Sequence, residues 1–227
     1  MKAYRKPIIA IDGPVGSGKS TTARKVAYEL GFIYVDTGAM YRAITLDVLE
    51  HGANPEDEEE VSKIVEQSQV ELLSSKEGRQ RTLLNGIDVT DRIRERDVTN
   101  TVSAVSAMKS VRDKMTYMQR VIGKNGGIVM EGRDIGTIVF PDAKFKFYID
   151  ASLEVRAQRR YKELAEKNIM VDINNLIREI KERDRLNTER SLAPLRKAED
   201  AIYINTSDMT FDEQVSRIVS IIRGDKS

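Results

Sequence analysis

A glycine-rich run that contains one lysine is the strongest chemical signal in the sequence. It reads Gly13-Pro14-Val15-Gly16-Ser17-Gly18-Lys19-Ser20-Thr21, follows an apolar segment that ends at Asp12, and opens a helical pattern. Glycines let consecutive backbone N–H groups point inward around phosphate oxygens, and the positive end of the following helix adds to the attraction. In such a P-loop, Lys19 reaches the β- and γ-phosphates and Ser20 binds Mg²⁺. We therefore predict a nucleotide phosphate site rather than an ordinary glycine-rich turn.

Arginines are the second chemical signal, because guanidinium groups suit phosphate oxygens. They fall at the ends of expected strands and on expected helices: Arg42, Arg133, Arg156, Arg159, Arg160, Arg183 and Arg190. Arg133 follows a buried-looking strand, and ligands of open α/β sheets bind at the carboxyl ends of strands. Arg183 continues the apolar stripe of its helix, so we expect it to point into a cleft, and Asn187 and Arg190 share its face if the helix continues.

Composition excludes several classes of function. The chain has 227 residues, no Cys and a single His, which removes thiolate chemistry and His-based metal sites. Lys and Arg total 37 against 36 Asp and Glu, so no global field attracts nucleic acid or an anionic membrane. No apolar run is long enough to span a membrane or to form a signal peptide, and we expect a cytoplasmic protein. The segments Asn-Lys-x-Asp and Asp-x-x-Gly of regulatory GTPases are absent.

Short apolar runs alternate with helical patterns, as in a parallel sheet that is covered on both faces. The expected strands are Ile8 to Ile11, Ile33 to Val35, Ile128 to Met130, Phe145 to Ile149 and Ile202 to Ile204. The expected helices include one from Lys19 to Leu30, one from Ala39 to Glu50, one capped by Asn54 with Pro55 at its first position, and one long helix marked by apolar residues from Val105 to Ile122.

Residues 70 to 90 break this alternation. Val70 to Leu73 and Thr82 to Leu84 have strand-like composition, and Asn85-Gly86 is typical of a tight hairpin turn. We therefore predict a small antiparallel insertion at about 68–98 in the parallel domain.

Four motifs together resemble one family. They are Ile11-Asp12-Gly13-Pro14, Asp36-Thr37-Gly38-Ala39-Met40-Tyr41-Arg42, Glu131-Gly132-Arg133-Asp134-Ile135-Gly136-Thr137, and Ala193-Pro194-Leu195. The first is shared with many P-loop proteins, whereas the second and third together are specific. From about residue 7 to residue 222 the chain resembles the bacterial cytidylate kinases. The resemblance implies a P-loop core at 1–67 and 99–227, a nucleoside-monophosphate-binding insert at 68–98, and a mobile helical lid at about 151–170.

The resemblance also implies roles for individual residues. Thr37, Arg42 and Arg133 are expected near the CMP phosphate, with help from Arg190, although Arg42 alone could be a solvated surface residue. Arg183, which its helical stripe directs toward a cleft, is a further candidate for binding CMP. The family reads cytosine through positions that correspond to Ser103, Arg112 and Asp134. Lys19 and the lid arginines Arg156 and Arg159 are expected to act in catalysis, although a solvated helical face would show the same arginine spacing. Glu131 could support Mg²⁺ through water or pair with Arg133. Asn187 departs from the family, which usually has an Asp in contact with the ribose at this position.

These observations lead to one expected activity, ATP-dependent phosphoryl transfer to CMP or dCMP with Mg²⁺ as cofactor. The expected partners are these small molecules alone, with no nucleic acid and no membrane, and the expected state is a monomer. Two alternatives remain open at this point. One is a P-loop kinase for another small metabolite, and the other is a nucleotide-binding module without transfer.

Overall fold

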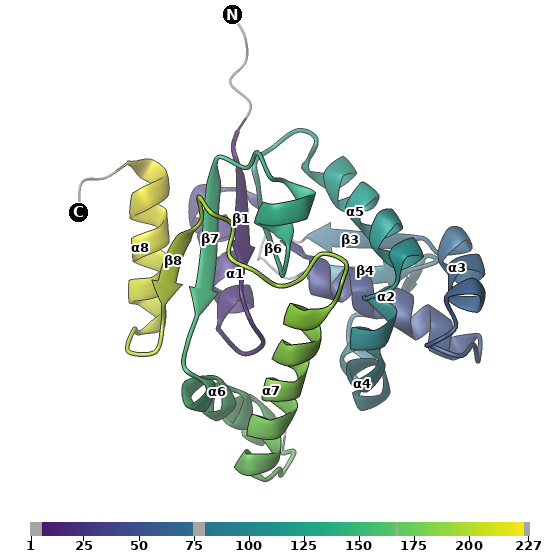
Figure 1. The fold of residues 1–227 in the computed structure, drawn as a ribbon. Coiled ribbons are helices and arrows are strands. Elements are labelled where there is room, and N and C mark those ends of the chain that lie inside the picture. Colours follow the sequence, from purple (N-terminus) through teal and green to yellow (C-terminus); the bar gives the residue numbers. More distant parts are fainter. Residues whose placement is uncertain (1–5, 75–79, 167, 225–227) are drawn as a thin grey trace, which may run out of the picture.

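A five-stranded parallel sheet forms the centre of the protein (Figure 1). The computed structural model describes residues 6–74, 80–166 and 168–224. The strand order is β2-β6-β1-β7-β8, and all neighbouring strands run parallel. The bounds are β1 Ile8–Asp12, β2 Ile33–Asp36, β6 Ile128–Gly132, β7 Phe145–Asp150 and β8 Ile202–Asn205. The predicted α/β fold with five parallel strands is confirmed.

Each strand extends past its expected apolar run by one or two residues at its carboxyl end. The added residues are largely polar: Asp12, Asp36, Glu131, Gly132, Asp150 and Asn205. Because parallel strands all end at the same edge of the sheet, this edge gathers the side chains that can do chemistry.

Helices cover both faces of the sheet. On one face α1 (Lys19–Leu30) and α8 (Phe211–Arg223) pack their apolar stripes on β1, β6, β7 and β8. On the other face α5 (Lys109–Gly123) and a π-helical turn η2 (Ile135–Val139) close a second apolar cluster around Met130 and Val35. The predicted end of α1 is confirmed, since Gly31 follows Leu30 in the left-handed conformation with φ of 63°.

A second body of helices lies beside the sheet with a small antiparallel sheet against it. Its helices are α2 (Thr37–Glu50), α3 (Glu58–Gln67) and α4 (Arg96–Val105), and its strands are β3 (Val70–Ser74), β4 (Gln80–Leu84) and β5 (Ile87–Asp88). A short 3₁₀ turn η1 (Arg92–Arg94) links β5 to α4. Ile44, Leu46, Val98 and Met115 are fully buried between these elements. The antiparallel hairpin predicted from Asn85-Gly86 is present, with Leu84 paired to Ile87.

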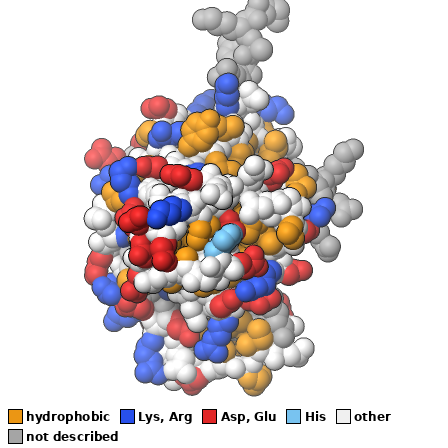
Figure 2. All heavy atoms as spheres, turned by 90° about the vertical axis from the view of Figure 1, so that its right-hand side faces the viewer, with side chains coloured by type: hydrophobic (Ala, Val, Ile, Leu, Met, Phe, Trp, Pro, Cys, Tyr) orange, Lys and Arg blue, Asp and Glu red, His pale blue; other side chains and the backbone are white. Residues whose placement is uncertain are grey.

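The helices α6 (Leu153–Glu166) and α7 (Ile173–Glu189) form a hairpin that stands at the carboxyl edge of the sheet, below β7 in Figure 1. Residues 75–79 of the expected insert and residue 167 of the expected lid lie outside the described residues. Among the helices that are described, none has the length and apolar character needed to span a bilayer. Figure 2 shows acidic and basic side chains interspersed on the face that carries α3, so neither sign dominates it.

Two helix predictions were wrong. The helix after Asn54 begins only at Glu58, because Asp57 caps it by accepting hydrogen bonds from the N–H groups of Glu59 and Glu60. The long helix expected from Val105 to Ile122 is two helices, since α4 ends at Val105 and Met108 is extended. Here the Glu58 carboxylate accepts from Lys109 N at 2.9 Å, so a side chain distant in sequence caps the new helix.

Candidate active site

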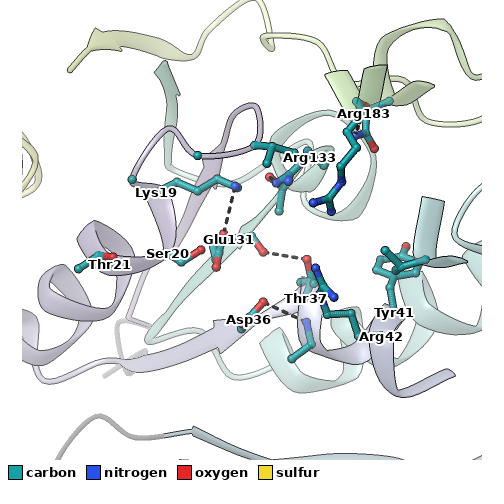
Figure 3. Close-up of a pocket in the computed structure, with 18 of the residues that line it drawn as sticks. Lys19, Ser20, Thr21, Asp36, Thr37, Tyr41, Arg42, Glu131, Arg133 and Arg183 are labelled. Carbon is teal, nitrogen blue, oxygen red and sulfur yellow. Dashed lines mark hydrogen bonds and ion pairs between the residues drawn. The ribbon is translucent and has the colours of Figure 1, made fainter. Parts of the chain in front are cut away.

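One cavity of about 750 Å³ opens at the carboxyl edge of the parallel sheet (Figure 3). It is lined by the P-loop and α1, by the start of α2, by α4 and α5, by the segment that follows β6, and by the α6–α7 hairpin. Most of the candidate residues named from the sequence line this one space, although they come from parts of the chain more than 150 residues apart. The fold therefore brings together candidate residues that lie far apart in the sequence.

The P-loop connects the central strand β1 to α1. Gly13 lies against the backbone of β7, where a Cβ atom would come within 2.0 Å of the Ile149 carbonyl oxygen, so no other residue fits. Gly16 and Gly18 have φ of 75° and 86°, which turns the loop around the start of α1. Ser17 and Lys19 are buried within it, and Ser20 and Thr21 line the cavity at the first turn of α1.

Lys19 and Glu131 form a buried pair at the floor of the cavity (Figure 3). Lys19 Nζ lies 3.8 Å from Glu131 Oε2 and donates to the Pro14 carbonyl at 3.2 Å. Burial lowers the pKa of Lys19, with the Arg133 charge adding to this effect, and burial raises the pKa of Glu131. Glu131 is also held from β2, because the Tyr34 hydroxyl donates to its Oε1 at 3.0 Å. The structure thus places Glu131 beside Lys19, and no ion pair joins it to Arg133 among the described residues.

Two of the arginines predicted for the lid, Arg156 and Arg159, lie against the P-loop backbone. Arg156 is 8% exposed and donates from Nε to the Ala151 carbonyl at 3.0 Å and from Nη1 to the Val15 carbonyl at 3.1 Å. It also pairs with Asp184 of α7, whose carboxylate accepts from Val15 N at 3.3 Å. In contrast to the catalytic role expected for it, Arg156 does not line the cavity, and its Nε and Nη1 donate to protein atoms.

Arg159 does line the cavity, but it too holds the loop. It donates to the Ser17 carbonyl at 3.1 Å and to the Thr206 carbonyl at 2.7 Å. Arg160, beside it, reaches the cavity while paired with Glu163 at 2.7 Å. Of the three arginines predicted for the lid, Arg159 and Arg160 line the cavity and Arg156 does not.

Three further arginines converge on the middle of the cavity, and Figure 3 shows Arg42, Arg133 and Arg183 directed toward it. Arg133 Nε and Arg183 Nε are buried and have no hydrogen-bond partner among the described residues. Burial lowers the pKa of Arg42 and of Arg183 to about 10, and neighbouring arginines add to both effects. Arg42 is anchored rather than solvated, because it donates to Thr99 Oγ1 at 2.8 Å. Such a group of cations with unsatisfied N–H donors is suited to a phosphate.

Thr37 lies at the first position of α2, directly below these arginines. Its hydroxyl donates to the Glu131 backbone carbonyl at 2.8 Å, while Asp36 caps the helix by accepting from Ala39 N at 3.0 Å. β2 and β6 pair with Asp36 opposite Glu131, and this register places the Thr37 hydroxyl beside the Glu131 carbonyl.

At the far end of the cavity, Arg112 and Asp134 form a buried ion pair, with relative exposures of 5% and 4%. The Arg112 guanidinium also stacks 5.4 Å from the centre of the Tyr41 ring and donates to the Ser106 carbonyl. Arg190 Nη2 lies 3.8 Å from Asp134 Oδ1, and Arg190 Nε donates to the Ala193 carbonyl at 2.8 Å. Ser103 lines the same end from α4. A donor and an acceptor held rigidly side by side can recognise the edge of a base.

Asn187 lines the cavity from α7. Its Nδ2 donates to the Arg183 carbonyl one turn earlier at 2.6 Å. One N–H of the amide is therefore engaged with the helix backbone, and Oδ1 and the second N–H remain for a ligand.

Sequence reasoning missed several residues that line the cavity, among them Tyr41, Arg94 and Ser106. Tyr41 could have been found, because it follows Thr37 by four residues and so shares its helical face. Arg94 lies 3.4 Å from Asp36 Oδ2 and comes from the turn after the small sheet. No local pattern marks Arg94 or Ser106, since tertiary packing alone brings them here.

The donor set fits Mg²⁺ that is held mainly by phosphates. Within the described residues no group of three His, Asp or Glu side chains could bind a metal by itself. Ser20 supplies a hydroxyl at the start of α1, and the Glu131 carboxylate lies close by in Figure 3. Mg²⁺ commonly takes one or two protein oxygens together with substrate phosphates and water, and this is the set present.

The central strand, the glycine loop with its buried lysine, and the arginine-lined cavity define a P-loop nucleotide-binding protein of the kinase type. The sequence model of the cytidylate kinase family matches residues 9–224. The chain belongs to the cytidylate kinase family.

Curated relatives agree with this family. A cytidylate kinase of Bacillus velezensis is 47% identical over 96% of this chain and 97% of its own length. A bifunctional pantoate ligase/cytidylate kinase of Prochlorococcus marinus is 47% identical over 97% of this chain, which spans only 43% of that longer protein. Among solved structures, an uncharacterized protein from Eubacterium ventriosum matches 96% of this chain and 99% of its own with a TM-score of 0.52 and 14% identity, a likeness of fold alone.

Proposed function

We propose that this chain transfers the γ-phosphoryl group of ATP to CMP or dCMP, giving ADP and CDP or dCDP. One observation carries the proposal: a single cavity holds the P-loop lysine at one end, the Arg112–Asp134 pair at the other, and arginines with unsatisfied N–H donors between them. Two anionic ligands that meet at the middle would satisfy those donors. Because one chain lines the whole cavity, we propose that the monomer is the active unit.

The reaction requires alignment and charge neutralisation more than acid–base chemistry. An anionic oxygen of the CMP phosphate attacks the γ-phosphorus, and the bond to the oxygen bridging the β- and γ-phosphates breaks as ADP leaves. The acceptor oxygen is already deprotonated, so no general base is needed. In this scheme Arg42, Arg133 and Arg183 hold the acceptor phosphate, while the P-loop amides and Lys19 hold the donor.

Mg²⁺, bound to Ser20 and the ATP phosphates with Glu131 close by, would neutralise phosphate charge. Tyr34 and Lys19 orient the Glu131 carboxylate at that place. Arg156 and Asp184 hold the P-loop backbone at Val15, and Arg159 holds it at Ser17, which keeps the donor loop in shape.

Asp134 and Arg112 are the proposed readers of cytosine. The carboxylate can accept a hydrogen bond from the exocyclic amine, and the guanidinium can donate to the ring acceptors. Ser103 adds a hydroxyl from α4, and Asn187 offers Oδ1 to the ribose. We further propose that 68–98 acts as the insert on the CMP side and 151–170 as the lid that excludes water.

A coupled assay of ADP release with ATP, Mg²⁺ and a panel of CMP, dCMP, UMP and AMP tests the proposal. Turnover with CMP or dCMP well above that with UMP and AMP is the expected result. ATP binding without release of ADP for any acceptor would indicate a non-catalytic binding module. Equal turnover with unrelated phosphorylated acceptors would instead indicate a kinase for another metabolite.

A further inference from the structure

Asp134 precedes a helical turn whose first N–H groups it does not cap. It is the residue just before η2, and its backbone carbonyl accepts from Ile138 N at 2.9 Å and Val139 N at 3.2 Å. An Asp at such a position commonly turns its own carboxylate back onto the N–H groups of the first turn. Here Asp134 makes no such side-chain bond, and its carboxylate instead pairs with Arg112 in the cavity.

The missing cap is supplied by Asp12, from the end of the central strand β1. Asp12 Oδ1 accepts from Ile135 N and Oδ2 accepts from Gly136 N, each at 2.8 Å. Asp12 is 5% exposed and lies opposite Gly132 in the sheet. Both carboxylate oxygens are therefore committed to the two N–H groups that would otherwise attract Asp134.

The arrangement is tightly packed. A Cβ atom added at Gly136 would lie 3.3 Å from Asp12 Oδ2 and 3.3 Å from Lys146 Cδ, so the turn approaches Asp12 closely. The Lys146 ammonium is directed away, to Asp200 at 2.7 Å. Within the described part of the chain no cation forms an ion pair with Asp12. The hydrogen bonds of its carboxylate therefore go to the backbone N–H groups of η2.

We propose that Asp12 is a positioning residue for acceptor specificity: by capping η2 in place of Asp134, it keeps the Asp134 carboxylate turned toward Arg112 and the base of the acceptor. The proposal rests on the proposed function, in which Asp134 reads cytosine. Asp12 also directly precedes the P-loop, so one side chain links the donor loop to the segment that reads the acceptor.

The variant Asp12→Asn tests this assignment with little change of shape. An amide has one acceptor oxygen, so it can satisfy only one of the two N–H groups, and its NH₂ group opposes the other. The Asp134 side chain directly precedes η2, so its carboxylate should then swing back onto the N–H group left without an acceptor. We expect the ratio of kcat/KM for CMP over UMP to fall by at least about tenfold, the effect of losing one hydrogen bond to a charged group.

The matched control is Asp57→Asn. Asp57 also accepts hydrogen bonds from two consecutive N–H groups, at the start of α3 and away from the cavity. Both bonds end on one oxygen, Oδ1, which Asn keeps, so Asp57→Asn should change neither the thermal stability appreciably nor the CMP to UMP ratio. The double variant Asp12→Asn with Asp134→Asn should have the same ratio as Asp134→Asn alone, because Asp12 acts through Asp134.

The possible results distinguish failure of the inference about Asp12 from failure of the proposed function. If wild type discriminates and Asp134→Asn abolishes discrimination while Asp12→Asn keeps it, the inference about Asp12 is overturned and the proposed function stands. If wild type uses CMP and UMP equally, Asp134 is not a reader, and the proposed acceptor and the inference both fail. A crystal structure of Asp12→Asn gives a readout independent of activity: Asp134 still paired with Arg112 would overturn the inference, and Asp134 turned onto η2 would support it.

Discussion

Replacing Arg183 by Gln should weaken CMP binding and yet stabilise the ligand-free protein. Arg183 lies on α7 among Arg42, Arg133 and Arg160, and its Nε has no hydrogen-bond partner among the described residues. Burial and these neighbouring charges lower its pKa from 12.5 to about 10. At neutral pH the charged form therefore costs the empty protein free energy that a neutral side chain would not.

The size of the effect follows from that pKa. A change from 12.5 to about 10 corresponds to about 3 kcal/mol, and partial exposure to solvent reduces it to about 1 kcal/mol. For a chain of 227 residues this should raise Tm by about 3 °C. In the complex the same charge contacts the phosphate, and the loss of a charge-assisted hydrogen bond of about 2 kcal/mol should raise the Kd for CMP about thirtyfold.

Calorimetric unfolding and titration of CMP would measure both effects. The matched control is Arg185→Gln, two residues further along α7, where the arginine is exposed and paired with Glu182 and Glu189. The control should change neither quantity appreciably. A variant at Arg183 that melts below wild type and binds CMP as tightly as wild type would refute the electrostatic reasoning.

Three further predictions follow from the site. Lys19→Met should lower kcat by at least about a hundredfold, since a preorganised electrostatic contact to the transferring phosphoryl group is lost. Single-turnover kinetics would measure this, and turnover like that of wild type would exclude the P-loop from the mechanism. Asn187→Asp should raise the ratio of kcat/KM for CMP over dCMP by up to about tenfold through a charge-assisted bond to the ribose, whereas parallel changes for both substrates would show that residue 187 does not touch the sugar. Burial raises the pKa of Asp12 to about 7. Protonation therefore stabilises the folded state, and this stabilisation is lost as pH rises toward 7. Urea titrations between about pH 7 and pH 5 should show wild type gaining about 1.4 kcal/mol per pH unit relative to Asp12→Asn as pH falls, and a flat difference would contradict this.

The P-loop and the sheet could be predicted because their signals are local. The glycines of the loop are required by its own backbone, and the apolar runs of the inner strands β1 and β6 are buried on both sides. Arg112 could not be placed from the sequence, since it lies beside the apolar stripe of its helix and could face either way. Its burial depends on Tyr41 and Asp134, which come from other elements.

Contacts between residues distant in sequence explain the other differences between the sequence predictions and the structure. The break between α4 and α5 depends on Glu58 from α3. Arg156 has the spacing of a lid arginine, but Asp184 and the Val15 carbonyl, which are distant in sequence, engage it. The π-helical turn after Asp134 likewise depends on Asp12, whose carboxylate lies more than 120 residues earlier in the chain.

The position of β1 in the middle of the sheet also bears on how the chain folds during synthesis. β1 leaves the ribosome before the other strands of the sheet, but its two neighbours are β6 and β7, and Ile8 pairs with Ile128. About 120 residues must therefore be made before the first strand meets either partner. Until then Ile8, Ile9 and Ile11 form an unpaired apolar strand, which is prone to aggregate. The P-loop can acquire its native shape only after β7 has emerged, because Gly13 packs on the carbonyl of Ile149.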